Sequence, residues 1–168
     1  KKQKSVFLHN YFLTNKKKNL LCKKINSTNP LLDLLFNGNK IVLSSSCVKR
    51  SFIKKNKIKF AEKRKLISVE DYDFWLKIAK FKGSFMLIEK ILGVYNLNNS
   101  SISKKRFIHF LNTFFLLNLY KNNFYKKNLI FSFRKLKILF SFIKISLIEK
   151  NFKFFFSLLK YYIFNISK

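Results

Sequence analysis

The segment EDYDFWLKIAKFKG, Glu70–Gly83, joins an acidic start to an apolar pattern of helical period and ends at a glycine. Phe74, Trp75 and Ile78 share one face at this period, while lysines lie away from it. The spacing therefore predicts a helix over Tyr72–Lys82. It also predicts that this helix buries an aromatic face in the core of the domain.

The two acidic residues at the start of this segment can have either of two roles. At the amino end of the predicted helix, Glu70 and Asp71 meet free backbone amides and the positive end of the helix dipole, so capping alone explains them. The same position keeps Asp71 ionised. A fixed, ionised carboxylate also suits a general base that takes a proton from a sugar hydroxyl. Spacing alone leaves both roles open.

Composition predicts a mixed α/β or helix-rich chain of ordinary core size. Of 168 residues, 48% are hydrophobic and 22 are Phe, while Gly numbers 3 and Pro 1, too few for a many-turned β-sandwich. The formal charge of +29 suits nucleic acid or an anionic membrane as partner. Lysine as the default surface residue of a chain encoded by an A/T-rich gene explains the same charge. Arginine is rare, which argues against a dedicated nucleic-acid reader.

Cysteine and histidine usage is sparse. Cys22 and Cys47 form no CxxC pair, and with His9 and His109 they assemble no zinc spacing. The pattern favours a reducing compartment. No signal peptide is recognisable, and lysines interrupt every stretch that approaches the ~18 apolar residues of a spanning helix.

The residues around the predicted helix read as an α/β arrangement. Ser5–Leu13 and Leu20–Ile25 are expected to form a β-hairpin. Pro30 is expected to open a short helix that Gly38 ends by taking a positive φ. Ser84–Leu97 is expected to be strand, turn and strand.

After Ser103 the chain becomes a basic, acid-poor tract, and its spacing predicts two or three amphipathic helices. Such helices can form a layer packed on the domain core. They can also lie on an anionic bilayer, which the width of the apolar faces favours. The predicted basic stripes comprise Lys127, Arg134, Lys137, Ser141 and Lys144, then Lys150, Lys153, Ser157 and Lys160.

The Glu70–Gly83 segment resembles the E-D-x-x-hydrophobic-W-L-R-hydrophobic-A-x-x-G segment of inverting family-two glycosyltransferases of the GT-A fold. Three neighbouring segments resemble that family as well: a serine-rich stretch, the stretch before the ED pair, and a Leu-Gly-x-Tyr turn. All four occur in the family's order. The neighbouring segments are KIVLSSSCVKRSFIKK (Lys40–Lys55), KFAEKRKLISVED (Lys59–Asp71) and ILGVYNLNNSSIS (Ile91–Ser103).

This resemblance implies the fold class and the domain boundaries. Residues 1–103 are expected to form the acceptor side of a GT-A catalytic domain, as the carboxyl-terminal half of that α/β fold. Residues 104–168 are expected to form a basic amphipathic helical tail.

The resemblance also implies roles for individual residues. Asp71 is expected to be the catalytic base, and Glu70 to help position the acceptor. Trp75 is expected to pack the helix or to line the acceptor subsite, next to Tyr72. Tyr95 matches the family tyrosine that supports the fold near the donor.

The sequence departs from the family pattern at the donor side. Asn96 and Asn98 stand where the family has Arg and a metal-proximal His, and an asparagine oxygen binds a cation less strongly than imidazole. No Asp precedes Asp33, so the Asp-x-Asp that holds the metal and the nucleotide sugar is missing. We therefore expect a divalent Mg or Mn ion only in the complete enzyme, no metal ligand in this chain, and no activity from this chain alone.

The expected function follows from the resemblance: transfer of a sugar, of the hexosyltransferase type, from a nucleotide-sugar donor to a glycan or lipid-linked hydroxyl with inversion. Such chemistry belongs to the biosynthesis of cell-surface polysaccharide. The expected location is cytoplasmic, peripheral at the inner face of the membrane. The alternative is a basic protein without catalysis that binds a membrane surface or nucleic acid.

Overall fold

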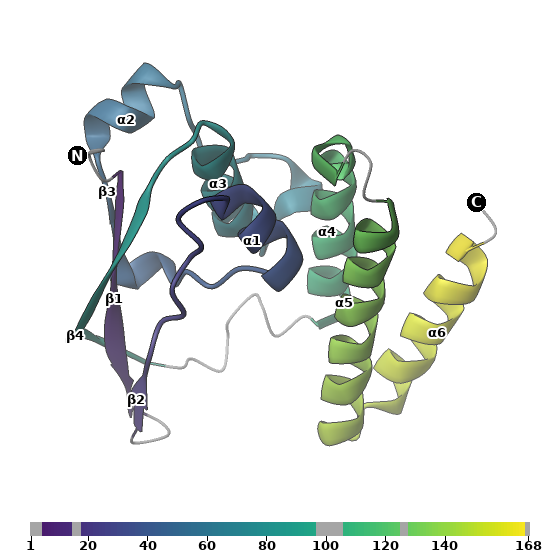
Figure 1. Cartoon of the computed structure of the whole chain (residues 1–168). Coiled ribbons are helices and arrows are strands. Elements are labelled where there is room, and N and C mark those ends of the chain that lie inside the picture. The colour runs from purple at the N-terminus through teal and green to yellow at the C-terminus, as the bar shows by residue number, and fades with distance from the viewer. Residues whose placement is uncertain (1–4, 15–17, 97–105, 125–127, 167–168) are drawn as a thin grey trace. The chain divides into compact units, whose positions relative to one another are not determined.

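The structure is a computed structural model that describes residues 5–14, 18–96, 106–124 and 128–166. The chain divides into two compact units, residues 1–101 and 102–168 (Figure 1). The first unit is mixed α/β and the second is helical. Each is considered by itself.

A single mixed sheet forms the frame of the first unit, with β1 (Val6–Leu13) at its centre. β4 (Phe85–Tyr95) pairs with β1 in parallel along its whole length. β2 (Lys18–Leu20) and β3 (Ser46–Val48) pair with it antiparallel, one at each end. Because a strand has only two edges, β2 and β3 share the edge of β1 that β4 leaves open.

The predicted hairpin is confirmed, although its second strand is shorter and earlier than expected. β1 and β2 pair from Leu13↔Lys18 to Tyr11↔Leu20, and no strand continues through residues 21–25. The backbone N–H of Cys22 instead donates to Oδ1 of buried Asn10 at 2.8 Å. The side chain of Asn10 on β1 thus replaces the next backbone hydrogen bond between the two strands.

The prediction of strand, turn and strand over Ser84–Leu97 is wrong, because β4 is one continuous strand. Gly93 lies inside it, where a Cβ atom would come within 3.0 Å of the His9 ring on β1. The glycine therefore marks a close approach of the neighbouring strand rather than a turn. Next to it the β1–β4 register shifts on both sides of Asn10, as at a β-bulge.

Three helices complete the first unit: α1 (Pro30–Asn37), α2 (Arg50–Lys55) and α3 (Glu70–Lys80). Two 3₁₀ turns accompany them, at Leu43–Ser45 and Arg64–Leu66. The expected start and end of α1 are confirmed. Proline opens the helix, Oδ1 of Asn29 caps it by accepting from the Leu32 N–H at 3.1 Å, and Gly38 ends it at φ 86°.

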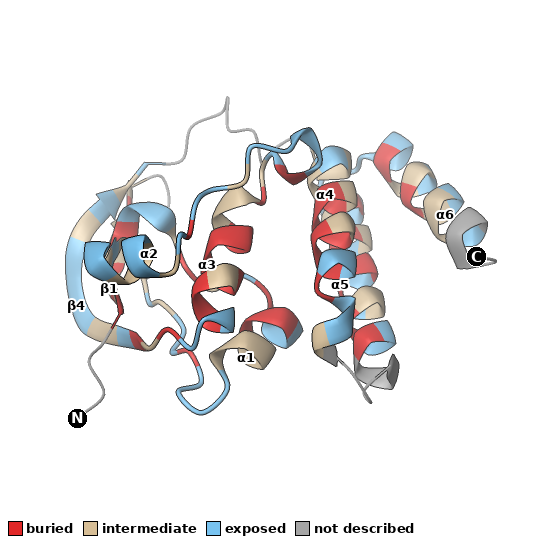
Figure 2. Ribbon diagram, turned by 90° about the horizontal axis from the view of Figure 1, so that it is seen from above, coloured by how far each residue is buried: buried red, intermediate tan, exposed pale blue. Residues whose placement is uncertain are grey.

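The core of the first unit is built on α3. Trp75, Leu76 and Ile78 are 0% exposed, and Figure 2 shows α3 as a largely buried helix. The hydroxyl of buried Tyr72 donates to the backbone oxygen of Leu34 at 2.7 Å, which ties α3 to α1. The helix predicted from the apolar spacing is confirmed, and it begins two residues earlier, at the ED pair.

The carboxyl end of α3 is closed by two crossed hydrogen bonds. The N–H of Gly83 donates to the oxygen of Ile78 at 2.9 Å, and the N–H of Lys82 donates to Ala79 at 3.0 Å. This is the Schellman arrangement, and Lys82 occupies its left-handed position at φ 58°. The expected stop at Gly83 holds, but its cause is space: a Cβ there would lie 2.4 Å from Ile78 Cγ2 and 2.8 Å from the Ile78 oxygen.

The second unit consists of three helices that contact one another: α4 (Arg106–Leu119), α5 (Asn128–Ile148) and α6 (Phe152–Ile166), with a 3₁₀ turn at Lys121–Phe124. Fully buried Phe110 lies at its centre, with its ring against those of Phe114, Phe142 and Tyr161. Among the described residues, no helix is both long and apolar enough to span a bilayer.

One member of the predicted basic stripe is misplaced. Arg134 is buried at 7% exposure, whereas Lys137, Ser141 and Lys144 are exposed as expected. Lys127 lies outside the described residues.

Substitutions at the two adjacent positions that close α3 should change the free energy of unfolding in opposite directions. Lys82→Gly removes the cost of a left-handed side-chain residue and should raise the free energy of unfolding by about 1 kcal/mol. Gly83→Ala forces a methyl group onto Ile78 and should lower it by about 2 kcal/mol. Urea denaturation of both variants tests this. Equal effects at the two positions would contradict the assignment of the cap.

Candidate functional site

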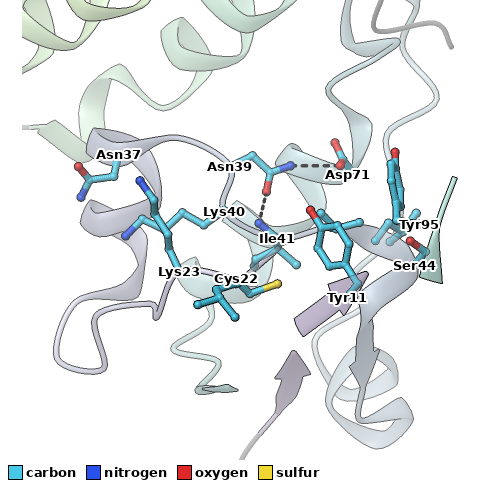
Figure 3. A pocket seen from close by; sticks show the side chains of 13 residues that line it. Tyr11, Cys22, Lys23, Asn37, Asn39, Lys40, Ile41, Ser44, Asp71 and Tyr95 are labelled. Atoms are coloured by element: carbon cyan, nitrogen blue, oxygen red, sulfur yellow. Dashed lines mark hydrogen bonds between the residues drawn. The ribbon is translucent and has the colours of Figure 1, made fainter. Parts of the chain in front are cut away.

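An open cleft of about 790 Å³ lies beside the amino end of α3 (Figure 3). Its walls come from segments far apart in sequence: β1, the chain after β2, the loop after α1, the first turn of α3 and the end of β4. The residues around it are Tyr11, Leu21, Cys22, Lys23, Asn37, Asn39, Lys40, Ile41, Val42, Leu43, Ser44, Asp71 and Tyr95.

Asp71 is the only acidic residue among those that surround the cleft. It lies in the first turn of α3, where Val69 provides no side-chain cap. Its Oδ1 accepts from the N–H of Tyr72 at 2.6 Å and its Oδ2 from Nδ2 of Asn39 at 3.1 Å. Asp71 is therefore a first-turn residue and not the N-cap of α3.

Burial raises the pKa of the Asp71 carboxyl above its ordinary value, and the nearby Glu70 carboxylate adds to the effect. The bonds from Tyr72 and Asn39 act in the opposite direction without cancelling it. In its ionised form, a carboxylate with a raised pKa is a stronger base than an ordinary aspartate.

Asn39 fixes the direction of the Asp71 side chain. Its Oδ1 accepts from the N–H of Ile41 at 3.0 Å, which leaves its Nδ2 pointing at Asp71 (Figure 3). The sequence pattern predicts no role for this residue, because the stretch around Gly38 indicates only the end of a helix. The signal available was an asparagine directly after a glycine cap, next to a short β-prone segment.

Two tyrosines form the wall near Asp71. Tyr11 on β1 and Tyr95 at the end of β4 have ring centroids 5.5 Å apart, tilted by 53°. They meet because β1 and β4 are parallel and in register at this end, with Leu13 opposite Tyr95. Tyr95 was predicted to support the fold near the donor, and no role was predicted for Tyr11. Burial, followed by the proximity of Cys22 and Tyr95, raises the pKa of Tyr11.

The opposite side of the cleft is basic (Figure 3). Lys23 is exposed there, and Lys40 is held by Asp33, with Nζ–O distances of 2.7 and 2.8 Å. The side chains of this pair are 12% and 8% exposed. The charge of Lys40 is therefore largely compensated by the Asp33 carboxylate, and Lys23 provides the exposed positive charge on this side of the cleft.

Asp33 has a pKa opposite in direction to that of Asp71. Burial alone would raise it, but hydrogen bonds from Lys40, from the N–H of Asn26 and from Nδ2 of Asn37 together hold it below its ordinary value. The two carboxylates thus differ in what surrounds them. Asp33 is a satisfied structural anion, whereas Asp71 is a partly desolvated one that faces a cleft.

The other predicted site residues of α3 do not reach the cleft. Trp75 is fully buried and Tyr72 is bonded to α1, so both pack the core rather than line an acceptor subsite. Glu70 is half-buried and is not one of the residues around the cleft. Its Oε2 has no hydrogen-bond partner within the described part of the chain. Asn98 lies outside the described residues.

The cleft provides poor ligands for a hard divalent cation. Mg²⁺ and Mn²⁺ prefer several oxygen ligands, usually including carboxylates, whereas both oxygens of Asp71 already accept hydrogen bonds. Within the described ranges, no three His, Cys, Asp or Glu side chains gather as metal ligands would. Cys22 is also held as a thiol, because burial raises its pKa.

Comparison with protein families, with curated proteins and with solved structures finds no match to this chain.

The raised pKa of Asp71 predicts a change in how stability depends on pH. The folded chain holds this proton more tightly than the unfolded chain, whose Asp pKa is about 3.9. The contribution of Asp71 is therefore most favourable below about pH 3.9 and falls as pH rises through the native pKa. Asp71→Asn should remove this fall. The free energy of unfolding, measured in urea, should therefore rise in the variant relative to the wild type as the pH increases from about 4 to about 7. A constant difference would contradict the assignment.

Asp33→Asn should have the opposite pH dependence. The contribution of Asp33 is present above about pH 3.9 and is lost as pH falls through its lowered native pKa. At neutral pH the variant leaves the half-buried Lys40 without its counter-charge and should lose about 1 to 2 kcal/mol of unfolding free energy. The double variant with Lys40→Met is the control, because it removes both charges. Thermal and urea unfolding should show it to be more stable than Asp33→Asn.

Proposed function

We propose that this chain supplies the acceptor site and the general base of an inverting glycosyltransferase of the GT-A type. One observation carries the proposal: the carboxylate of Asp71 faces an open cleft, is held by two hydrogen bonds and has a raised pKa. The resemblance of the ED segment to family-two enzymes suggested this residue, and its position beside a cleft supports the suggestion.

In the proposed reaction, an acceptor hydroxyl attacks the anomeric carbon of the donor sugar as Asp71 takes the hydroxyl proton. A bond forms between the acceptor oxygen and the anomeric carbon, and the bond to the nucleoside diphosphate breaks. The electron pair of that bond leaves with the diphosphate. Attack from the face opposite the leaving group inverts the anomeric centre.

The remaining cleft residues suit a sugar acceptor. The rings of Tyr11 and Tyr95 offer apolar surface for the C–H faces of a sugar, and polar groups of Asn37 and Ser44 can bind its hydroxyls. Asn39 keeps the base aimed while the acceptor enters. The volume of about 790 Å³ accommodates more than one sugar ring.

The donor side of the reaction is proposed to lie elsewhere. The nucleotide sugar and its divalent Mg or Mn ion need acidic ligands that this cleft lacks, so we assign them to an Asp-x-Asp segment outside these residues. The mixed α/β frame is compatible with such an arrangement. Free thiols at Cys22 and Cys47 favour a reducing location such as the cytoplasm.

The decisive experiment is sugar transfer by the complete natural polypeptide carrying Asp71→Asn. A labelled panel of nucleotide sugars is offered with membrane extracts as the source of glycan and lipid-linked acceptors. We expect transfer to fall by about 10²- to 10⁴-fold, because the amide cannot take the proton. The control is Glu89→Gln, which removes one exposed carboxylate on β4.

Near wild-type transfer by Asp71→Asn, with folding unchanged, would remove the base assignment. If the wild type transfers no sugar from any donor but binds vesicles or nucleic acid, the alternative without catalysis is correct. The charge of +29 is the observation that favours that alternative.

A further inference from the structure

The outward surface of α5 in the second unit combines large apolar side chains with lysines. Phe133, Lys137, Phe140, Lys144 and Leu147 follow one another at steps of three and four residues, so they lie on one stripe of the helix. All five are exposed, and Phe140 is 64% exposed. We call this set the α5 stripe.

α6 repeats the design. Phe152, Lys153, Phe156, Lys160 and Ile163 are spaced along one face, and all are exposed; Phe156 is 65% exposed. We call this set the α6 stripe. A helical unit whose core is already filled around Phe110 has no structural need for exposed phenylalanines, so they indicate a surface that meets a partner.

The charge around the stripes selects the partner. Glu149 is the only acidic residue after Glu89 in the sequence, and it is held in an ion pair with Arg106 at 2.8 Å. The lysines of the two stripes are therefore surrounded by positive charge, which attracts an anionic surface. A second copy of the chain would place lysine against lysine, and an acidic carbohydrate would leave the apolar side chains in water.

We propose that the α5 and α6 stripes dock on an anionic phospholipid bilayer, with both helices lying in the plane of the interface. The phenylalanines, Leu147 and Ile163 enter the boundary between headgroups and acyl chains. Lysine side chains are long enough to reach back to the lipid phosphates while their methylene stems stay in apolar surroundings. The proposal does not depend on the glycosyltransferase assignment.

The test is co-sedimentation of the full chain with vesicles of phosphatidylcholine, with and without about one third phosphatidylglycerol. We expect strong binding only with the anionic lipid, and weaker binding as salt rises, because salt screens the lysines. The quadruple variant Lys137→Gln, Lys144→Gln, Lys153→Gln and Lys160→Gln should bind roughly 100- to 1,000-fold more weakly.

The matched control removes the same charge from the first unit through Lys54→Gln, Lys55→Gln, Lys57→Gln and Lys59→Gln, all at exposed positions. It should bind within about threefold of the wild type, since the proposal assigns the contact with the bilayer to the second unit alone. Equal losses in the two quadruple variants would overturn the proposal. They would show attraction by net charge alone.

A second variant tests the apolar part. Phe140→Ser with Phe156→Ser leaves the charge intact and should weaken vesicle binding at least tenfold, with the helical circular dichroism of the free protein unchanged. Binding unaffected by these substitutions, or displaced completely by short duplex DNA, would assign the surface to nucleic acid instead and overturn the proposal.

Discussion

The first unit depends on the burial of the apolar face of α3. Trp75 and its neighbours on this face are removed from water, and the hydroxyl of Tyr72 finds its partner on α1 rather than in solvent. A helix anchored in this way has little freedom to rotate or slide, because any shift would open a cavity or leave a buried hydroxyl unpaired. Its first turn is therefore presented to the cleft in one fixed direction.

That rigidity lets a core helix also hold a carboxylate towards an open cleft. Two aspartates of α3 have different surroundings because of their positions on the helix. The carboxylate of Asp71 faces the cleft, while Asp73, two residues later, is buried and paired with Lys77 at 2.6 Å. Asp33 likewise has partners for both of its oxygens. Of these acids, only Asp71 combines a raised pKa with access to an open volume.

Local patterns predicted the local structure well. The start and end of α1, the apolar face of α3, the strand β1 and the helical nature of the second unit follow from proline, glycine and hydrophobic spacing. The turn predicted within Ser84–Leu97 was wrong because the sequence does not distinguish a glycine in a turn from a glycine that lies against a neighbouring ring, as Gly93 does. Lys82 was predicted to be the last helical residue, whereas it occupies the left-handed position of the cap after α3.

The site was only half predictable for a related reason. Asp71 and Tyr95 were predicted as site residues, on the acceptor and donor sides respectively, from a resemblance of their segments that the comparisons do not support, and the structure places both beside one cleft. Tyr11 and Asn39 join them through the parallel pairing of β1 with β4 and through the path of the loop after α1, and no short stretch of sequence encodes either. Trp75 was expected next to the acceptor or in the core, and burial of the whole aromatic face of α3 places it in the core.

The pairing of β1 with β4 has a consequence for the way the chain is made. The central strand lies near the start of the sequence, yet its longest neighbour ends at Tyr95. During synthesis β1 can form only its hairpin with β2 and its short pairing with β3, while its other edge waits for more than seventy further residues to leave the ribosome. Assembly of the sheet is therefore late and dominated by distant contacts, which slows folding and leaves an edge of unpaired backbone groups open to self-association in the meantime.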